Sequence, residues 1–379
     1  MQAPPSTWIP ERGTPHAVAL EILRHGPLAR SDVAKRLNLS AATLTRLAGP
    51  LIEAGLLEEI GERAQSGAGR PKRLLDVKPR SRYFIGVKVT GEQVLGVVTD
   101  LRADVVHRAA LPLPSREPAA VVSQIGALVA TLAGAGYAVT AIGIGVGALT
   151  REGVVLGAPF LGWENVPLKQ LVADRTGIPT VVDNDVVALT EGEHWFGAGR
   201  GLDRFAVVTL GAGIGYGTVI NGGIVVDEDT GIGLVGHWPL DPLGPLCPAG
   251  HRGCARSVLT RSAIVEAVSG VLGREVGYDE ALDAAEAGHP GARRVVDDAG
   301  RGLGRLLAAI ANLTLPELVI IGGEGVRLVS VARDAVDEGM RADRDPRARA
   351  IPLTTMAGDD ADWCRGAAVL AIQTFALGT

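Results

Sequence analysis

Residues 83–100 read YFIGVKVTGEQVLGVVTD, two runs rich in β-branched residues that are separated by a short polar turn. Such runs are typical of paired β-strands, so we predict a strand hairpin over 83–89 and 94–100. A helical pattern over 120–132 and a further strand pattern over 142–146 follow. This order of patterns predicts an α/β lobe.

A similar order of patterns recurs in the second half of the chain. Residues 204–210 and 217–221 have strand patterns, a long helical region follows, and 318–321 is a strand pattern that ends in two glycines. The recurrence predicts two comparable α/β lobes around a cleft, formed by residues 83–379. A chain of 379 residues is also too long for a single hydrophobic core.

Residues 1–82 have the pattern of a winged helix-turn-helix that precedes these lobes. A first helix is predicted to have Thr14 as its N-cap. Ser31 is predicted to cap a second helix and Ser40 a third, with a tight turn between them. Pro50 lies within the third helical pattern, where it deletes a backbone hydrogen bond, so we expect a kink or a break just before it.

The third helix is predicted to carry the DNA contacts. On a helical wheel its leucines gather on one side, while small and polar residues with one arginine lie on the other. Small residues with one arginine suit entry into a major groove. The residues assigned to this contact are Ser40, Ala42, Thr43, Thr45 and Arg46.

Two strands, 56–60 and 73–77, are predicted to form the hairpin of a wing. The tip between them, residues 67–72, is basic and flanked by glycine. An extended Arg70 could reach into a minor groove, with Lys72 beside it on the wing. A solvated hairpin tip without a DNA contact is the alternative interpretation.

The charge of the chain is divided unequally. The chain has 37 basic and 42 acidic residues. Residues 1–82 hold 13 basic and 8 acidic ones, a net charge of +5, and the remaining 24 basic and 34 acidic residues give the rest of the chain a net charge of −10. A basic head on an acidic body directs a polyanion such as double-stranded DNA to the head. A merely solvated charged face would give the same count.

Composition excludes several other classes of protein. No run of about 18 apolar residues is present, and residues 1–11 lack the pattern of a signal peptide, so we expect a cytoplasmic protein without a membrane partner. Three cysteines are too few for a disulfide framework. Cys247 and Cys254 lie seven positions apart in a glycine-rich loop, which favours metal binding or plain burial.

Six short motifs together resemble those of the ROK group of sugar kinases and sugar-responsive repressors. That group has an actin-like, hexokinase-like fold of two lobes, and the resemblance implies that fold here. Its repressors have a winged head and its kinases lack one. The motifs follow in the order and approximate spacing of the group, at 158–163, 183–185, 211–215, 233–237, 247–254 and 321–323.

The resemblance implies a kinase site that has lost part of its chemistry. Asp185 stands where the kinases of the group keep the catalytic base, and Asn184 where they hold a sugar hydroxyl. In the first of the two turns that bind phosphate in these kinases, Lys88 replaces a carboxylate. In the second turn, Ala212 and Tyr216 differ from the residues that the group usually has. Because a lysine cannot hold magnesium, we expect no ATP turnover and no enzyme. Asp185 would then contact a ligand, or would be retained from a kinase ancestor without a present role.

The sugar-binding side differs from the group as well. Leu234 and Arg256 stand where the group has glutamates, and Phe160 where an asparagine is common. Buried polar groups left unpaired cost about 1 to 3 kcal/mol each, so this pocket suits a plain hexose poorly. We expect an effector that is less sugar-like or differently decorated, or none. The ligand-binding candidates are Asn184, Asp185, His237, Phe160 and Leu234.

Two alternatives at these positions stay open at this point. Asn184 and Asp185 also fit a strand-to-helix turn with side-chain capping. His237, Cys247 and Cys254 match three of the four structural zinc ligands of the group, but Ala249 replaces the fourth. Structural zinc is nearly always four-coordinate, so His251 or a water would have to complete it. The alternative to a zinc site is a pair of reduced thiols that pack in a turn without a metal.

These observations predict a transcriptional regulator, with repression favoured, that binds an inverted-repeat operator. We expect a homodimer, or a dimer of dimers, assembled through residues 83–379, with a small-molecule effector in the degenerate cleft. One alternative is an active sugar kinase with a DNA-binding head. Another is an effector-independent regulator whose body serves only for assembly.

Overall fold

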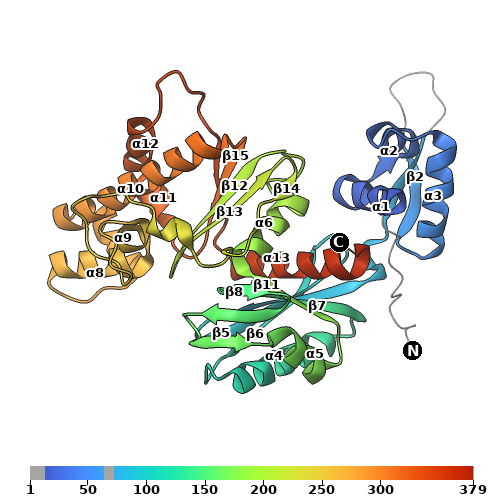
Figure 1. Ribbon diagram of the computed structural model, residues 1–379, viewed down its shortest axis with the longest axis horizontal. Helices are drawn as coiled ribbons and strands as arrows, with labels where there is room; N and C mark the ends of the chain where they lie inside the picture. Colours follow the sequence, from blue (N-terminus) through green and yellow to red (C-terminus); the bar gives the residue numbers. More distant parts are fainter. Residues whose placement is uncertain (1–12, 64–71, 379) are drawn as a thin grey trace. The chain divides into compact units, whose positions relative to one another are not determined.

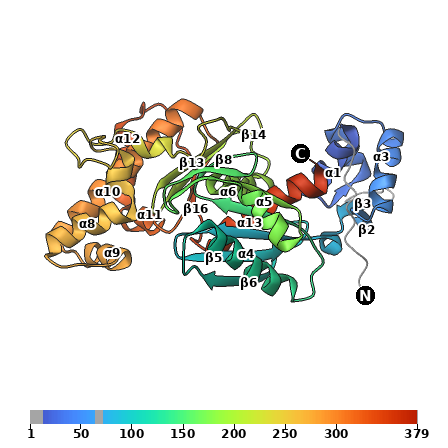
Figure 2. The same cartoon turned by 60° about the horizontal axis from the view of Figure 1, so that its bottom comes forward.

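The structure is a computed structural model that describes residues 13–63 and 72–378. The chain divides into two compact units, the first formed by Met1–Arg200 with Asp360–Thr379 and the second by Gly201–Asp359. The ribbons are drawn in Figures 1 and 2. No helix within the described ranges is both long and apolar enough to cross a bilayer.

The first unit begins with a winged helix-turn-helix, drawn in blue in Figure 1. Its three strands form an antiparallel sheet in the order β1-β3-β2. The predicted head fold is confirmed. Its elements are α1 (Thr14–His25), β1 (Leu28–Ala29), α2 (Arg30–Arg36), α3 (Ala41–Glu53), β2 (Leu57–Arg63) and β3 (Lys72–Val77).

The N-termini of the first two helices differ from the prediction. The N-cap of α1 is Gly13, so Thr14 is already helical. Helix α2 begins directly after strand β1, with Ala29 as an N-cap that makes no side-chain hydrogen bond. Ser31 was therefore wrongly assigned as a cap. Pairing of β1 with β3 fixes where the helix can begin, and a short strand of two residues gave no pattern in the sequence.

Helix α3 follows the prediction at its start and departs from it later. The Ser40 side chain caps it by accepting a hydrogen bond from the Thr43 backbone N–H at 3.1 Å. The helix continues through Pro50 to Glu53, so the predicted break is wrong. A proline crowds the Cβ of the residue before it, and that residue is Gly49, which has none. Burial of Leu44, Ala48 and Leu51 holds the helix on the head core.

The rest of the first unit is built on a mixed sheet in the order β11-β7-β4-β5-β6. Strands β4, β7 and β11 are parallel, and β4, β5 and β6 form an antiparallel meander. The predicted hairpin is confirmed as β4 and β5. The strands are β4 (Tyr83–Val89), β5 (Gln93–Thr99), β6 (Val105–Pro112), β7 (Val139–Val146) and β11 (Thr180–Asn184).

Helices cover both faces of this sheet. Helix α4 packs on the core that contains Ile85 and Ile142, and α13 on the core that contains the opposite-facing Phe84 and Ala141. The helices are α4 (Pro118–Ala133), α5 (Leu168–Thr176), α6 (Asp185–Phe196), α13 (Asp360–Ile372) and the π-helix η3 (Gln373–Leu377). The smaller elements are η1 (Pro79–Ser81), β8 (Leu149–Arg151), β9 (Val154–Ala158) and β10 (Trp163–Val166).

Glycines allow α13 to lie unusually close to its neighbours. A methyl group on Gly86 of β4 or Gly143 of β7 would overlap a backbone carbonyl of α13. A methyl group on Gly366 of α13 would meet a carbonyl of α6. Only glycine leaves room for such backbone contact. Helix α13 is thereby fixed between the sheet and α6, the two elements that carry Lys88 and Asp185.

The head and this lobe are joined within the first unit. Buried residues of α1, α3 and β3 form one hydrophobic cluster with Leu101 and with residues of α13 and η3. Arg102 donates to the Leu23 carbonyl at the end of α1 at 3.1 Å and pairs with Asp76 of β3. Arg24 donates to the carbonyl of His194, in the last turn of α6, at 3.1 Å. Arg102 thus places a cation at the C-terminus of α1 and Arg24 places one at the C-terminus of α6, an arrangement that the helix dipoles favour.

The second unit holds a sheet in the order β14-β13-β12-β15-β16, with helices packed into a single large hydrophobic cluster. The predicted strands 204–210, 217–221 and 318–321 correspond to three of its members. The strands are β12 (Phe205–Leu210), β13 (Ile214–Ile220), β14 (Gly223–Ile224), β15 (Leu318–Gly322) and β16 (Leu353–Thr355). The helices are η2 (Leu234–His237), α7 (Ala255–Leu259), α8 (Arg261–Leu272), α9 (Tyr278–Glu286), α10 (Pro290–Thr314), α11 (Arg327–Val331) and α12 (Arg333–Ala342).

Candidate functional site

Helix α3 turns one face to solvent and the other to the head core. Ser40, Ala42, Thr45 and Arg46 are exposed and Thr43 is half-buried. The hydroxyls on this face are already engaged: the Ser40 and Thr43 hydroxyl oxygens are 2.8 Å apart, and Thr45 donates to the Ala41 carbonyl at 3.0 Å. Arg46 has no hydrogen bond or ion pair with the part of the chain that the structure describes. Its five donors are therefore free for a partner.

Two arginines that sequence reasoning missed lie beside this face. Arg30 of α2 pairs with Glu59 of β2 at 2.5 Å, and its other nitrogen lies 3.5 Å from the Thr45 hydroxyl. Arg73 of β3 pairs with the same Glu59 at 3.2 Å. The hydrogen bond from Arg30 is the main reason why the pKa of Glu59 is lowered. Arg30 and Thr45 belong to different helices, so no helical periodicity could have joined them.

The wing is described only in part. Lys72 is the first residue of β3, and its backbone pairs with Arg63 of β2. Arg70, the other wing residue singled out in the sequence, lies outside the described residues.

A part-buried ion pair joins β4 to the start of α6 in the first unit. Lys88 of β4 donates from Nζ to Oδ2 of Asp185, the first residue of α6. Lys88 is 8% exposed, and its ammonium lies 3.9 Å from the ring centroid of Trp363 on α13. Pairing with Lys88 neutralises the charge of Asp185, and the aromatic face adds a cation–π contact. Neither partner was predicted to meet the other.

Asn184 serves the fold. Its side-chain oxygen accepts hydrogen bonds from the backbone N–H groups of Val186 at 2.9 Å and Val187 at 3.2 Å. Its amide nitrogen donates to the Ala148 carbonyl at 3.0 Å. Of the alternatives left open by the sequence, capping of α6 therefore describes Asn184. One amide hydrogen remains for a ligand.

Phe160 and Asp185 face the same small space. A methyl group built on Gly147 would lie 3.4 Å from Asp185 Oδ2 and 3.9 Å from a ring carbon of Phe160. Arg116, which sequence reasoning missed, donates to the carbonyls of Gly91 at 2.9 Å and Phe160 at 3.3 Å. The space beside Gly147 is thus bordered by the ring of Phe160 and by the carboxylate of Asp185, which is paired with Lys88. Such a lining offers few free acceptors for sugar hydroxyls.

The other two ligand candidates lie in the second unit, within η2. Leu234 is 59% exposed, and His237 is half-buried. Burial, aided by the neighbouring His251 and Arg256, lowers the pKa of His237. This shift keeps the imidazole in the neutral form, which is the form that binds metals.

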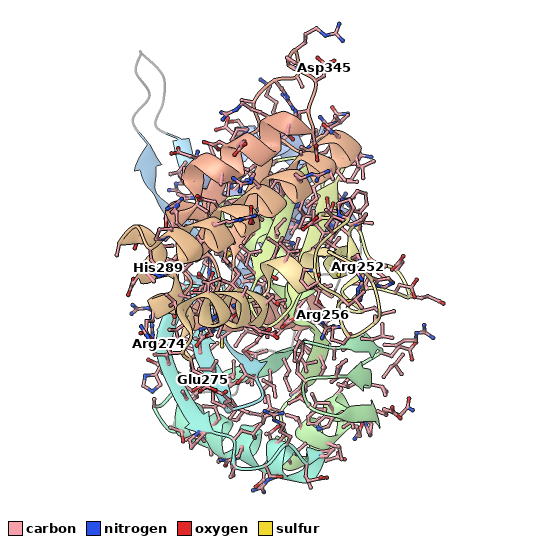
Figure 3. All side chains as sticks on the ribbon, turned by 90° about the vertical axis from the view of Figure 1, so that its left-hand side faces the viewer. Arg252, Arg256, Arg274, Glu275, His289 and Asp345 are labelled. Carbon is pink, nitrogen blue, oxygen red and sulfur yellow. The ribbon has the colours of Figure 1, made fainter. Side chains whose placement is uncertain are left out.

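A cluster of histidine and cysteine that could hold a metal ion lies in the same unit. Donor atoms of His237, Cys247 and Cys254 all lie within 4.8 Å of one another. The two cysteines are buried and free. One imidazole nitrogen and two sulfurs are ligands that zinc prefers, so the donor set fits that metal. Arg252 and Arg256, labelled in Figure 3, come from this loop and from α7.

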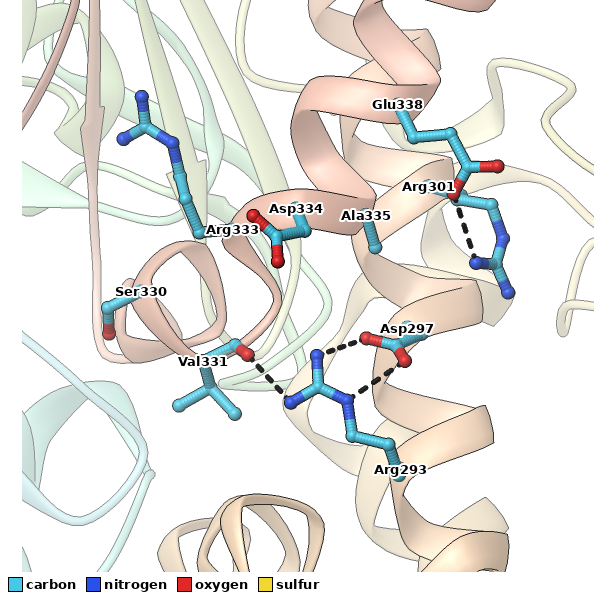
Figure 4. Close-up of a pocket in the computed structure, with 9 residues that line it drawn as sticks. All are labelled: Arg293, Asp297, Arg301, Ser330, Val331, Arg333, Asp334, Ala335 and Glu338. Atoms are coloured by element: carbon cyan, nitrogen blue, oxygen red, sulfur yellow. Dashed lines mark hydrogen bonds and ion pairs between the residues drawn. The ribbon is translucent and has the colours of Figure 1, made fainter. Parts of the chain in front are cut away.

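A hollow of about 460 Å³ lies among α10, α11 and α12. Figure 4 shows two of its arginines engaged: Arg293 donates to Asp297 at 2.9 Å and to the Val331 carbonyl at 3.0 Å, and Arg301 pairs with Glu338 at 3.3 Å. The charges that line this hollow are largely satisfied by one another. We therefore assign it no ligand.

Comparison with known proteins agrees with this geometry. Residues 84–374 match the ROK family. The xylose repressor of Bacillus subtilis (strain 168) is 26% identical over 306 residues, which are 79% of each chain.

Two solved structures share the fold. A ROK family transcriptional regulator, a homolog of the Escherichia coli MLC protein, is 24% identical with a TM-score of 0.80 and covers 94% of this chain and 95% of its own. A ROK family glucokinase from Streptomyces griseus, in complex with glucose and AMPPNP, is 27% identical with a TM-score of 0.66 and covers 77% and 99%. Coverage of 94% must include most of the head, whereas coverage of 77% need not.

Proposed function

Because this chain belongs to the ROK family, we propose that it is a DNA-binding transcriptional regulator, most specifically a repressor, that acts in the cytoplasm. The observation that carries the proposal is the exposed face of α3, which bears an unpaired Arg46 on a winged head of net charge +5. The similarity to a xylose repressor and to a regulator aligned over 94% of this chain supports it. The same face has no use in a sugar kinase.

In this proposal residues 1–82 form the DNA-binding domain and 83–379 the effector and dimerisation domain. Helix α3 enters the major groove, where Arg46 reads a base edge, and Arg70 with Lys72 contacts DNA from the wing. Arg30 lies beside Thr45 of α3, and Arg73 shares its partner Glu59, so both arginines are proposed to contact phosphates. A homodimer would present two such heads to an inverted repeat, with half-site spacing set by the bodies.

The test begins with occupancy mapping across the genome to identify an operator. Anisotropy titrations of the operator and of an unrelated duplex are then measured for Arg46→Ala, Lys72→Ala and a control. Arg46→Ala should reduce discrimination by about 1 to 3 kcal/mol. Lys72→Ala should weaken both duplexes alike and lower the salt slope by about 1.

Arg80→Ala is the matched control, because Arg80 is an exposed arginine outside α3 and the wing. It should leave the difference between operator and unrelated duplex unchanged. If Arg46→Ala behaves like Arg80→Ala, the assignment of α3 is wrong.

For the body we propose that kinase chemistry has been lost. The Lys88–Asp185 pair supports this, because a base that is ion-paired to a buried lysine is a poor acceptor for a sugar proton and no carboxylate stands at position 88 for magnesium. The retained Asp185 and the likeness to a glucokinase favour the alternative of an active kinase. A coupled ADP-release assay with glucose and MgATP distinguishes the two. Turnover above background would overturn the proposal.

We also propose that an effector, where one binds, is not a plain hexose. The space between Phe160 and Asp185 has few free acceptors, since Asn184 and Asp185 are engaged by the protein. Calorimetry with glucose, N-acetylglucosamine and xylose should show no micromolar binding. Tight binding of one of them that is lost in Asp185→Ala would refute this. Operator affinity unchanged by a wide panel of metabolites would favour a body used only for assembly.

The histidine and cysteine cluster is proposed to hold a structural zinc ion. The mixed sulfur and nitrogen donors of His237, Cys247 and Cys254 support it. Bound zinc would fix the loop between η2 and α7 by cross-linking its two ends. Metal analysis of protein purified without added zinc tests this, and a metal content near zero would refute it.

A further inference from the structure

The proposed zinc site has three donors that match its family, whereas structural zinc takes four. The chain has Ala249 where the resemblance would place a third cysteine, and a methyl group cannot ligate. A fourth donor must therefore come from elsewhere in the loop or from water. The loop itself shows which residue is in place.

Backbone hydrogen bonds fold residues 247–254 back on themselves. The Cys247 N–H donates to the His251 carbonyl at 2.9 Å, and the Gly250 N–H donates to the Cys247 carbonyl at 2.8 Å. Gly250 has a φ of 84°, a value that glycine adopts readily. An isolated bridge between Leu246 and Arg252 closes the turn. This turn returns the chain so that His251 lies over Cys247.

Two contacts bring the His251 ring next to Cys247 and His237. Its Nδ1 lies 3.7 Å from Cys247 Sγ and 2.9 Å from His237 Nδ1, and His237 Nδ1 is also 3.7 Å from Cys247 Sγ. Tetrahedral zinc with the usual bond lengths separates a sulfur from a nitrogen by about 3.6 Å and two nitrogens by about 3.4 Å. The two sulfur to nitrogen edges at Cys247 already match, and the nitrogen to nitrogen edge has to open only slightly. His251 is not among the donors that all lie within 4.8 Å of one another, so its ring has to turn toward Cys254 when metal binds.

We infer that His251 is the fourth ligand of this site, which becomes a Cys2His2 centre formed by His237, Cys247, His251 and Cys254. The inference rests on the zinc proposed above. It replaces the lost cysteine by a histidine two positions further along the same turn. With two thiolates in place of three, the occupied site is electrically neutral. His251 is exposed, so the metal would lie at the surface end of the loop.

The experiment compares four forms of the full chain: wild type, His251→Ala, His251→Ala combined with Ala249→Cys, and Leu243→Ala. Leu243 is 90% exposed in the same loop and carries no donor, which makes it the matched control. Zinc content and affinity are measured by elemental analysis and chelator competition. Circular dichroism checks that each form is folded.

Wild type and Leu243→Ala should hold one zinc ion per chain. His251→Ala should lose affinity by at least about tenfold, because even second-shell changes cost 10- to 100-fold. Ala249→Cys should restore affinity in the His251→Ala background by returning a third thiolate. Cobalt substitution gives a second readout: sulfur to cobalt charge-transfer absorbance should rise with the number of thiolates, from wild type to the restored double variant.

Each outcome has a distinct meaning. Wild type without zinc refutes the zinc proposal, while operator binding still decides the regulator proposal separately. Wild type with zinc and His251→Ala with equal affinity refutes the role of His251 and leaves water as the fourth ligand. Loss of zinc in His251→Ala that Ala249→Cys does not reverse would also count against it, provided that the double variant is folded.

Discussion

Removal of Lys88 should destabilise the first unit strongly. Lys88→Met keeps the length of the side chain and deletes its charge, which leaves Asp185 without its cation at a site where its side chain is only 13% exposed. Breaking one partner of a buried ion pair costs about 3 to 5 kcal/mol, because the remaining charge is uncompensated. The lost contact with Trp363 is part of that cost. We therefore expect a loss of about 3 kcal/mol or more.

Substitution of Asp185, the partner of Lys88, tests the expected loss of stability more sharply. In Asp185→Asn the buried ammonium is left without its anion, so a similar loss is expected. The double variant Lys88→Met with Asp185→Asn buries no net charge, and replacement of a whole buried pair is often close to neutral. The double variant should therefore be more stable than either single one.

The assay is hydrogen exchange of the α6 amides in the full chain, because a chain of two compact units need not unfold in one step. Lys78→Met is the control, since Lys78 is exposed in the same unit. Protection lost equally in the control, or retained in Lys88→Met to within about 0.5 kcal/mol, would show that the pair does not stabilise this site. A double variant no better than the single ones would contradict the pairing itself.

Three further substitutions test the packing. Leu44→Ala, at a fully buried position of α3, should cost the head about 2 to 5 kcal/mol by chemical denaturation. Arg102→Ala removes the cation that joins Asp76 to the end of α1, and should cost about 1.5 to 3 kcal/mol, seen as faster proteolysis of the head; the exposed Arg274→Ala should have no such effect. Gly143→Ala would overlap α13 and should yield little folded protein, and full expression at the wild-type melting temperature would contradict the packing described here.

Local signals predicted much of the fold. The strand hairpin of β4 and β5, the three head helices and the cap at Ser40 all depend on neighbouring residues, and periodicity or capping chemistry reports on such neighbours. The errors arose where tertiary structure overrides a local rule. Ser31 resembles a cap, yet α2 begins earlier because strand pairing ends at Ala29. Pro50 resembles a helix breaker, yet Gly49 relieves the clash.

The candidate sites were less accessible to sequence reasoning. Lys88 and Asp185 are 97 residues apart and meet only because β4 and α6 border the same space. The sequence marked Lys88 as the loss of a metal ligand, but it held no sign that the lysine would neutralise Asp185. His251 was named only as one of two possible donors, because the spacing of residues in the sequence does not determine on which side of the turn the His251 side chain lies. Arg116 carried no motif at all.

Helix α6 gives the chain a short mechanical link. Its 12 residues span about 18 Å, with Asp185 in the first turn and the carbonyl that receives Arg24 of the head in the last. A molecule that separated Lys88 from Asp185 would remove a contact at the N-terminus of α6. The C-terminus of the same helix contacts Arg24 of the winged head. Both ends of α6 belong to the first unit, so this connection between the ion pair and the winged head stays within that unit.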